Sequence, residues 1–178
     1  KRENSKRSDY ELVTKNIRFD FYNEIIANEN TNIVLLGHHK DDIVENIFAN
    51  VCRGRYILDL AVIKNKSIIN NVLIARPLID HYKSSIYNFA DENQIPYFKD
   101  TTPDWSIRGK YRNQIYPLIE DAFSKNIKNN LIGLSKQSYD WNILIMKTIV
   151  NPFMQSINIE NNIVEFNVKD YLDYPVCF

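Results

Sequence analysis

Residues 33–46 read IVLLGHHKDDIVEN, an apolar run followed by a glycine, two histidines, a lysine and a group of acidic residues. The run 33–36 is typical of a short buried strand, and the spacing of Ile43, Val44 and Ile47 after it is typical of a helix. A fully apolar strand between two helical segments favours burial on both faces and therefore a parallel sheet. Such α/β domains present chemical groups at the carboxyl ends of their strands. We therefore expect residues 37–46 to carry the functional site.

The residue types in this stretch leave several kinds of site open. Asp41 and Asp42 would lie in the first helical turn, where carboxylates suit the helix dipole, and Glu45 would lie one turn further along. Each could be only an N-cap or a solvated side chain. His38 and His39 beside two carboxylates are a common arrangement for binding a polar substrate, transferring a proton or binding a metal.

A transition-metal site is the weaker of these alternatives. The spacing His-His-x-Asp-Asp lacks the two histidines four residues apart that a helical zinc site uses. The third histidine, His81, precedes a separate helical pattern and is expected on the surface. We therefore predict no metal site built from the protein alone, and leave open Mg²⁺ held through carboxylates and substrate phosphates.

Composition limits the class of protein. The chain has 178 residues, which suits one domain or an incomplete domain with a small appendage. Its 22 basic and 22 acidic residues cancel, so nucleic-acid binding would need a local basic face. No apolar run reaches the roughly 20 residues that cross a bilayer, and no signal peptide is visible. We expect a cytoplasmic protein without a membrane partner, or one in an organelle stroma or matrix if a targeting segment is missing.

Cysteine usage agrees with this expectation. Cys52 and Cys177 form no CxxC pair and no disulfide framework, which fits a reducing compartment. Cys52 is expected to be a small core residue. The sequence carries no signal for an oligomeric state.

Periodicity predicts alternating helices and strands along the first two thirds of the chain. One helix is expected over about residues 8–26, and another from Asp41 to a stop at Arg53-Gly54. A short hairpin over residues 68–74 is expected to turn at Asn70-Asn71, and a later helix leads to a brief strand at Tyr97-Phe98. This alternation predicts an α/β fold with a doubly wound parallel sheet.

The chain changes character after Pro117. Apolar spacing predicts two helices over residues 118–150, ending at Asn151-Pro152, and then a terminal hairpin around Asn161-Asn162. Trp141 and the tyrosines are expected mainly in the core. The basic residues could either contact nucleic-acid phosphates or be ordinary solvated side chains. They are Lys125, Lys128, Lys136 and Lys147, together with Lys1, Arg2, Lys6 and Arg7 at the other end.

Five blocks of sequence carry a more specific signal. They are residues 37–46, Arg53-Gly54, Arg76-Pro77-Leu78, Asp100, and the pair Arg108 and Arg112 before Pro117. In order and spacing, these blocks resemble the tRNA(Ile)-lysidine synthetase branch of the PP-loop ATP pyrophosphatases. The resemblance implies a partial doubly wound sheet of the adenine nucleotide alpha hydrolase-like type. On this basis we expect residues 1–120 to be the C-terminal portion of a PP-loop domain, and residues 121–178 to begin a helical, tRNA-binding domain.

The resemblance also implies a reaction. ATP, with Mg²⁺, adenylates the wobble cytidine of an isoleucine tRNA, and the amine of free lysine then attacks the activated carbon and expels AMP. The implied catalytic residues are His38, His39, Asp41 and Asp42. The implied substrate-binding residues are Glu45, Asn46, Arg108 and Arg112. The two arginines lie four positions apart, so they share one face if their segment is helical.

The chain departs from the family pattern in several places. Asn46 stands where threonine is usual, Gly109 where asparagine is usual, and the stretch from Asp100 to Arg108 is shorter than usual. Residues 102–112 also resemble PP-loop enzymes that thiolate tRNA, but the cysteine pairs those enzymes often use do not occur. The SGGxDS-type loop that cradles ATP is absent from these residues. We expect this loop in a segment before Lys1; otherwise the protein is a non-catalytic remnant that binds RNA or a partner.

Overall fold

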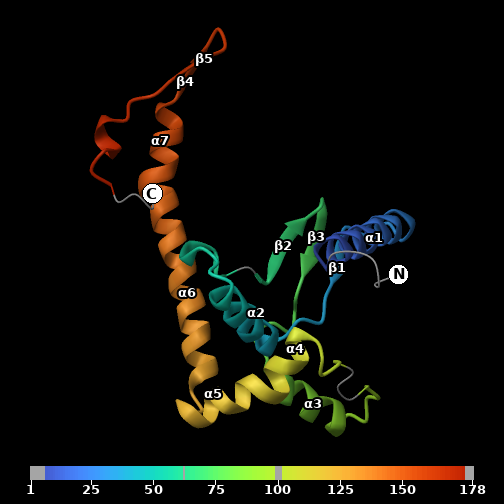
Figure 1. Ribbon diagram of the computed structural model, residues 1–178. Helices are drawn as coiled ribbons and strands as arrows, with labels where there is room; N and C mark the ends of the chain where they lie inside the picture. Colours follow the sequence, from blue (N-terminus) through green and yellow to red (C-terminus); the bar gives the residue numbers. More distant parts are fainter. Residues whose placement is uncertain (1–6, 62, 99–101, 175–178) are drawn as a thin grey trace.

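The computed structural model describes residues 7–61, 63–98 and 102–174 of the chain. It is a mixed α/β structure with a small sheet and several helices, and a long helical column stands apart from that sheet (Figure 1). Within the described ranges, no helix combines the length and the apolar character needed to cross a bilayer.

The sheet has three strands in the order β1-β3-β2, with bounds β1 (Ile33–Leu35), β2 (Lys66–Ile69) and β3 (Val72–Ala75). Strand β1 pairs with β3 in parallel, and β2 pairs with β3 in antiparallel fashion. Asn70 and Asn71 have φ angles of 48° and 63°, the two positive values that a type I′ turn requires. The parallel pairing and the hairpin predicted from the sequence are both confirmed.

One face of the sheet packs on helix α1 (Arg7–Asn28). Phe19 of α1 and Val72 and Ile74 of β3 are buried together in the core. Partly buried side chains complete this layer: Tyr22, Ile26, Val34, Leu36 and Ile69. The helix predicted before the first strand is therefore present, and one side of it packs on the sheet.

The opposite face of the sheet is more open than expected. Leu35 of β1 is 66% exposed, and Ile68 of β2 is also exposed. Helix α2 (Lys40–Cys52) follows β1 but packs mainly against α6 (Ile127–Ile145). The prediction that β1 is buried on both faces is wrong, because β1 is an edge strand and only α1 packs closely on the sheet.

The contact between α2 and α6 gives the molecule a second packed region. Val44 and Ile47 of α2 are almost fully buried. The short helix η2 (Ile57–Asp59) also packs on α6, and the N–H of Leu60 donates to Ser138 Oγ at 3.2 Å. Helix α2 is thereby held against the column, with its first turn at the end of the sheet (Figure 1).

Two further helical segments pass beneath the site. Helix α3 (Lys83–Glu92) begins where the sequence predicts it. Helix α4 (Ile107–Lys110), the π-helical turn η3 (Tyr111–Ile115) and helix α5 (Tyr116–Ala122) form one continuous stretch. This stretch carries both arginines of the predicted site.

Gly109 of α4 allows a close approach of the preceding loop. A Cβ atom at this position would lie 2.2 Å from the carbonyl oxygen of Pro103 and 2.9 Å from Cα of Asp104. Such distances are too short for any side chain, so only glycine fits here. The glycine at this position and the short loop before it therefore fit together structurally.

The column continues further than predicted. Helix α6 passes through the π-helical turn η4 (Met146–Val150) into α7 (Asn151–Ser156) without a break (Figure 1). The predicted end at Asn151-Pro152 is wrong. A π-helical turn already interrupts the regular hydrogen bonding before Pro152, so the missing N–H of proline does not end the helix there.

The terminal hairpin is confirmed. Strands β4 (Asn158–Glu160) and β5 (Ile163–Glu165) pair in antiparallel fashion. Asn161 and Asn162 again adopt positive φ angles, 51° and 62°. The short 3₁₀ turn η5 (Lys169–Tyr171) follows, and the whole unit projects from the far end of the column (Figure 1).

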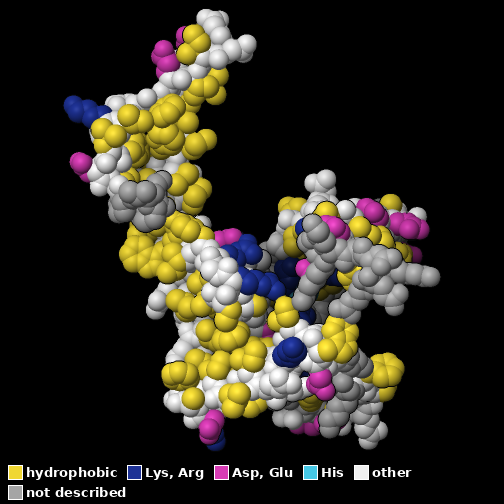
Figure 2. Space-filling view, in the orientation of Figure 1, with side chains coloured by type: hydrophobic (Ala, Val, Ile, Leu, Met, Phe, Trp, Pro, Cys, Tyr) yellow, Lys and Arg dark blue, Asp and Glu magenta, His cyan; other side chains and the backbone are white. Residues whose placement is uncertain are grey.

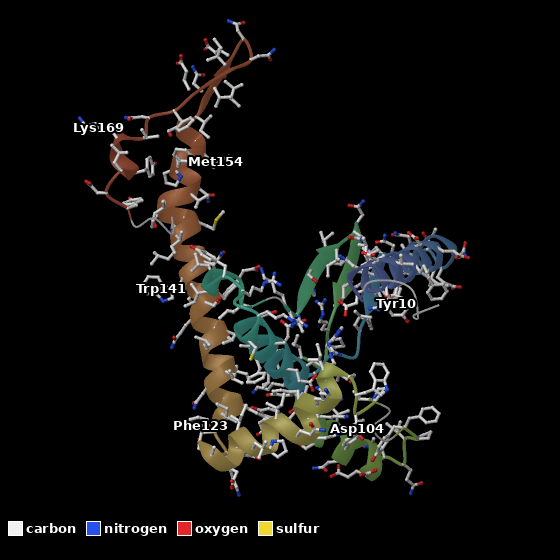
Figure 3. The ribbon with its side chains drawn as sticks, in the orientation of Figure 1. Tyr10, Asp104, Phe123, Trp141, Met154 and Lys169 are labelled. Atoms are coloured by element: carbon white, nitrogen blue, oxygen red, sulfur yellow. The ribbon has the colours of Figure 1, made fainter. Side chains whose placement is uncertain are left out.

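Three expectations based on residue type are wrong. Tyr97 and Phe98 form no strand, and Phe98 is 93% exposed, because none of the strands in the described ranges pairs with this segment. Trp141 on α6 is exposed, since the column packs against α2 along only part of its surface (Figure 3). Cys52 is exposed at the end of α2. Among the described tyrosines the expectation of a core position holds only at Tyr111, whereas Tyr10, Tyr56, Tyr97, Tyr139 and Tyr174 are exposed.

Candidate functional site

The first turn of α2 is capped by its own residues. His39 is the N-cap, and its backbone N–H donates to Asp42 Oδ2 at 3.0 Å. The Asp42 N–H donates in turn to the His39 carbonyl oxygen at 3.0 Å. This reciprocal pair satisfies groups that a helix start leaves unbonded. Asp42 is only 6% exposed, so its charge also needs cationic partners.

Two arginines supply these partners. Arg112 Nη2 lies 3.5 Å and Arg108 Nη1 4.0 Å from Asp42 Oδ1. The same arginines reach Glu45: Arg112 Nε donates to Oε1, and Arg108 Nε lies 3.7 Å from Oε2. Glu45 is 7% exposed, which excludes the alternative of a solvated surface residue. Two carboxylates of α2 and two guanidinium groups therefore form one charged cluster.

The arginines reach this cluster from one helical face, as their spacing predicts. Arg108 lies in α4 and Arg112 in the π-helical turn η3. Turns of this kind are frequent at functional sites. Arg112 Nη1 also donates to Thr102 Oγ1 at 3.1 Å, whereas the Arg108 side chain is 55% exposed. Arg112 is thus the anchored member of the pair, and Arg108 is the member that is accessible to a ligand.

Asp41 makes different contacts from Asp42. Its Oδ2 accepts from the backbone N–H of Lys83 at 2.8 Å, at the start of α3. Its Oδ1 accepts from Lys128 Nζ of α6. Burial acts to raise the pKa of Asp41, but the hydrogen bonds from Lys128 and Lys83 outweigh it and hold the pKa below its ordinary value. Asp41 therefore stays ionised and connects α2 to α3 and α6.

His38 lies just beyond the end of β1, beside the residues that follow β3 in the parallel pair. Burial lowers its pKa; Arg76, Arg108 and His39 add to this effect, and Asp42 opposes it. The imidazole is therefore neutral at pH 7. Its Nδ1 is buried and has no hydrogen-bond partner among the described residues. A neutral imidazole can accept a proton.

Arg76 directly follows β3 and is buried. Its Nη1 donates to the Lys64 carbonyl oxygen at 2.7 Å and to Ser67 Oγ at 2.9 Å. Its backbone N–H donates to the Asn65 carbonyl oxygen at 2.8 Å. Arg76 therefore fastens the strand end to the loop before β2, and contributes positive charge near His38.

Glu45 and Tyr111 line two clefts. The first, of about 600 Å³, opens toward α3 and α6, and the second, of about 610 Å³, opens toward α4 and the end of α2. Lining the first are Asp41, Tyr82, Tyr116, Lys125, Lys128 and Asn129. Lining the second are Asn46, Arg53, Thr102, Ser106, Ile107 and Arg108. Basic side chains gather in the recess between the column and the sheet (Figure 2).

Most predicted site residues converge on this region. His39 Nδ1 lies 3.5 Å from Asp42 Oδ2 and 3.9 Å from Asp41 Oδ2, which joins the histidine to the carboxylates. Asn46 is different: its Oδ1 accepts from Asn50 Nδ2 at 3.1 Å, and it lines the second cleft rather than joining the charged cluster.

Sequence reasoning gave no site role to three residues that line the first cleft. The sequence suggests only phosphate contact for Lys128 and no role for Tyr82 or Tyr116. No local pattern marks them, because they approach Asp41 only through the packing of α3, α5 and α6. The remaining predicted positions lie outside the described residues: Lys1, Arg2, Lys6, Asp100 and Cys177.

The charged cluster is not a ready metal site. In the part of the chain that the structure describes, no three His, Cys, Asp or Glu side chains converge to hold an ion. Asp41, Asp42 and Glu45 each already face a protein cation. Mg²⁺ therefore has no preformed set of ligands in these carboxylates.

The structure is a mixed α/β domain whose buried carboxylates lie at the carboxyl edge of its parallel strand pair, where α/β domains usually bind ligands. Residues 2–119 match the family model of the PP-loop domain. The chain therefore belongs to the PP-loop family.

Among curated proteins, the chain is similar to tRNA(Ile)-lysidine synthases. It is 30% identical over 162 residues to that of Francisella philomiragia subsp. philomiragia, an alignment covering 89% of this chain and 40% of that protein. It is 26% identical over 166 residues to that of Chlamydia felis, covering 92% of this chain and 52% of that protein. The chain spans about half the length of the curated relatives it matches.

Proposed function

We propose that this chain is part of an ATP-dependent tRNA-modifying ligase that joins lysine to the wobble cytidine of an isoleucine tRNA. The observation that carries the proposal is the cluster of Asp42, Glu45, Arg108 and Arg112, which combines buried anions with an accessible cation at a strand end. The relatives' names support the same reaction. In it, the cytidine oxygen attacks the α-phosphate of ATP and pyrophosphate leaves; a lysine amine then attacks the ring carbon and AMP leaves.

The charges of the cluster suit both ligands of the second step. The phosphate of the adenylate would attract the exposed Arg108. Asp42 and Glu45 would then lose cationic partners in a poorly solvated place, which favours their binding of a lysine ammonium. The incoming anion and the incoming cation would thus replace the existing ion pairs.

An amine must lose a proton before it can attack a carbon atom. His38 is half-buried and neutral at pH 7, and its Nδ1 has no hydrogen-bond partner among the described residues. We assign it the role of proton acceptor, with Asp42 and the other carboxylates holding the ammonium beforehand. His39, which caps α2 and faces Asp41 and Asp42, would position both carboxylates.

The proposal extends to the larger architecture. We assign residues 1–120 to the C-terminal portion of a doubly wound PP-loop domain, and residues 121–178 to the start of a tRNA-binding helical domain in a cytoplasmic or organellar protein. ATP is the adenylating substrate, and Mg²⁺ would accompany its phosphates; no step is assigned to Mg²⁺ on Asp41, Asp42 or Glu45, because these face protein cations.

The test is to incubate the natural gene product that contains this chain with ATP, labelled lysine and total tRNA, and to analyse the nucleosides. Lysine in a modified cytidine is the expected product. A thionucleoside formed with a sulfur donor would replace the proposal with tRNA thiolation. Neither product, together with no pyrophosphate release, would identify a non-catalytic remnant.

A residue-level test separates the charge of Asp42 from its capping role. Asp42→Asn keeps an oxygen that can accept from the His39 N–H, so α2 should start normally. We expect lysine transfer to fall about 100-fold or more, the effect typical of removing one electrostatic contact at a reacting centre. Circular dichroism should stay unchanged, and unchanged transfer would remove Asp42 from the site.

A further inference from the structure

An ammonium group already occupies the first cleft, and it belongs to the protein. Lys128 Nζ donates to Asp41 Oδ1 and lies 4.8 Å from the centre of the Tyr116 ring and 5.7 Å from the centre of the Tyr82 ring. A carboxylate beside aromatic ring faces is the chemistry that recognises ammonium ligands. These three residues, Asp41, Tyr82 and Tyr116, are called the ammonium cage below.

The cage is held in place by contacts other than Lys128. Tyr82 Oη donates to Asn129 Oδ1 at 2.8 Å, and Tyr116 Oη donates to Glu120 Oε1 at 3.0 Å. Asp41 Oδ2 accepts from the Lys83 N–H at 2.8 Å. Because both rings and the carboxylate have their own anchors, the cage should persist when the Lys128 ammonium leaves it.

The position of Lys128 in its own helix does not explain this contact. Lys128 is the second residue of α6, and the first turn of a helix disfavours a cation because the helix dipole is positive there. Its partner Asp41 lies in α2, far away in the sequence. The ammonium is therefore drawn to the cage by Asp41 and the rings.

The cleft around the cage can admit a small ligand. Its volume of about 600 Å³ falls within the usual range for small-molecule sites, and Glu45 and Arg112 also line it. Lys128 keeps 31% of its side chain exposed, and its four-carbon stem is flexible. The ammonium can therefore swing out without unfolding α6.

We propose that the ammonium cage is the binding site for the primary ammonium of an amino ligand, and that Lys128 occupies it in the free protein as an internal competitor. The inference rests on the proposed function only in naming lysine as the amino ligand. Free lysine carries two ammonium groups, and the cage would hold the one that Asp42 and Glu45 do not bind. Only molecules with an empty cage can bind the amino ligand. The apparent dissociation constant is therefore the intrinsic dissociation constant divided by the fraction of molecules in which the cage is empty. Other amines would therefore bind weakly while Lys128 fills the cage. The cage would become available when Lys128 moves out of it.

The test compares amine binding by the natural protein and by Lys128→Met, which removes the ammonium and keeps an unbranched side chain. Isothermal titration calorimetry gives the dissociation constants of L-lysine, which carries a carboxylate, and of n-butylamine, which does not. We expect both dissociation constants to fall about tenfold in Lys128→Met. Lys136→Met, on the same helix but outside the cleft, should bind as the natural protein does. Equal or weaker binding by Lys128→Met would overturn the proposal.

A second variant controls for destabilisation of Lys128→Met through loss of the cation that pairs with Asp41. Lys128→Gln has an amide that can still donate to Asp41, and it should also bind n-butylamine more tightly than the natural protein. A lower unfolding temperature with no gain in amine affinity for either variant would mean that Lys128 only fastens α6 to α2, and would overturn the proposal.

The two proposals fail in different ways. Tighter n-butylamine binding by Lys128→Met, without any lysine-modified cytidine, would contradict only the proposed reaction. Formation of that nucleoside with an unchanged amine affinity in Lys128→Met would contradict only the internal competitor.

Discussion

Helices α1 and α2 lie on either side of β1 in the chain, and they depart from the usual burial pattern in opposite ways. Helix α1 carries an exposed apolar stripe whose members are spaced three and four residues apart (Figure 3 labels Tyr10). The stripe consists of Tyr10, Val13, Ile17, Phe21 and Ile25. Helix α2 instead buries the carboxylates of Asp42 and Glu45.

The exposed apolar stripe of α1 and the buried carboxylates of α2 have different structural explanations. Helix α1 packs on the sheet through Phe19 and its neighbours, so the exposed stripe is a second apolar face, as in helices covered on two sides. A contiguous exposed apolar patch marks an interaction surface. The buried carboxylates of α2, by contrast, are matched by cations from later segments of the same chain. Among the described residues, the buried carboxylates of α2 therefore have partners, whereas the exposed apolar stripe of α1 is not covered.

The sharpest test of this contrast is to remove Arg112, the anchored of the two arginines in the buried cluster. Arg112→Ala leaves Glu45 buried with only the more distant Arg108, and we expect a loss of about 3 kcal/mol in the free energy of unfolding. Urea denaturation measures the loss. Arg55→Ala breaks the exposed Arg55–Asp59 pair and should cost less than about 1 kcal/mol. Equal costs would mean that the cluster behaves as ordinary surface charge.

A matched pair of isoleucines compares the two helices directly. Ile47→Ala in α2 removes an almost fully buried side chain and should cost about 2–4 kcal/mol, through lost burial and the cavity left behind. Ile17→Ala in α1 removes an exposed side chain and should change the free energy of unfolding by less than about 0.5 kcal/mol.

Thermal unfolding monitored at one protein concentration measures both changes. A large destabilisation by Ile17→Ala in the isolated chain would show that the α1 stripe is covered in solution, for instance by a second copy. Dilution of the protein would then lower its unfolding temperature, which separates association from intramolecular packing.

The smallest expected effect is a pH dependence at His38. The folded state disfavours the protonated imidazole, so the unfolded state binds more protons below the ordinary pKa of 6.5. The contribution of His38 to stability is complete above pH 6.5 and is lost as the pH falls below it. His38→Gln should therefore reduce the difference between the unfolding midpoints at pH 5.5 and pH 7.5.

Local patterns predicted the local structures well. The strand before Gly37, the helix after His39 and the two Asn-Asn hairpins depend on residues close in sequence, and the structure contains all of them. Three of the failures share one cause. Burial of β1, the strand at Tyr97-Phe98 and the core position of Trp141 each depended on neighbours from other segments, which periodicity does not specify.

The candidate site divides in the same way. The cluster of histidines and carboxylates was visible because strand, turn and helix are consecutive, and the spacing of Arg108 and Arg112 placed them on one face. The sequence did not indicate that these arginines would contact Asp42 and Glu45, or that Lys128 would contact Asp41. Those contacts depend on how α4, η3 and α6 pack around α2.

The sequence by itself determined the strand–turn–helix unit at residues 33–52 and the set of chemical groups it carries, because helix starts, turns and strands depend on short-range sterics and hydrogen bonds. Only the tertiary structure decided which of those groups are buried, which cations neutralise them and which apolar face of α1 stays open. Burial and charge pairing depend on distances between segments that are remote in the chain, and those distances are set by packing.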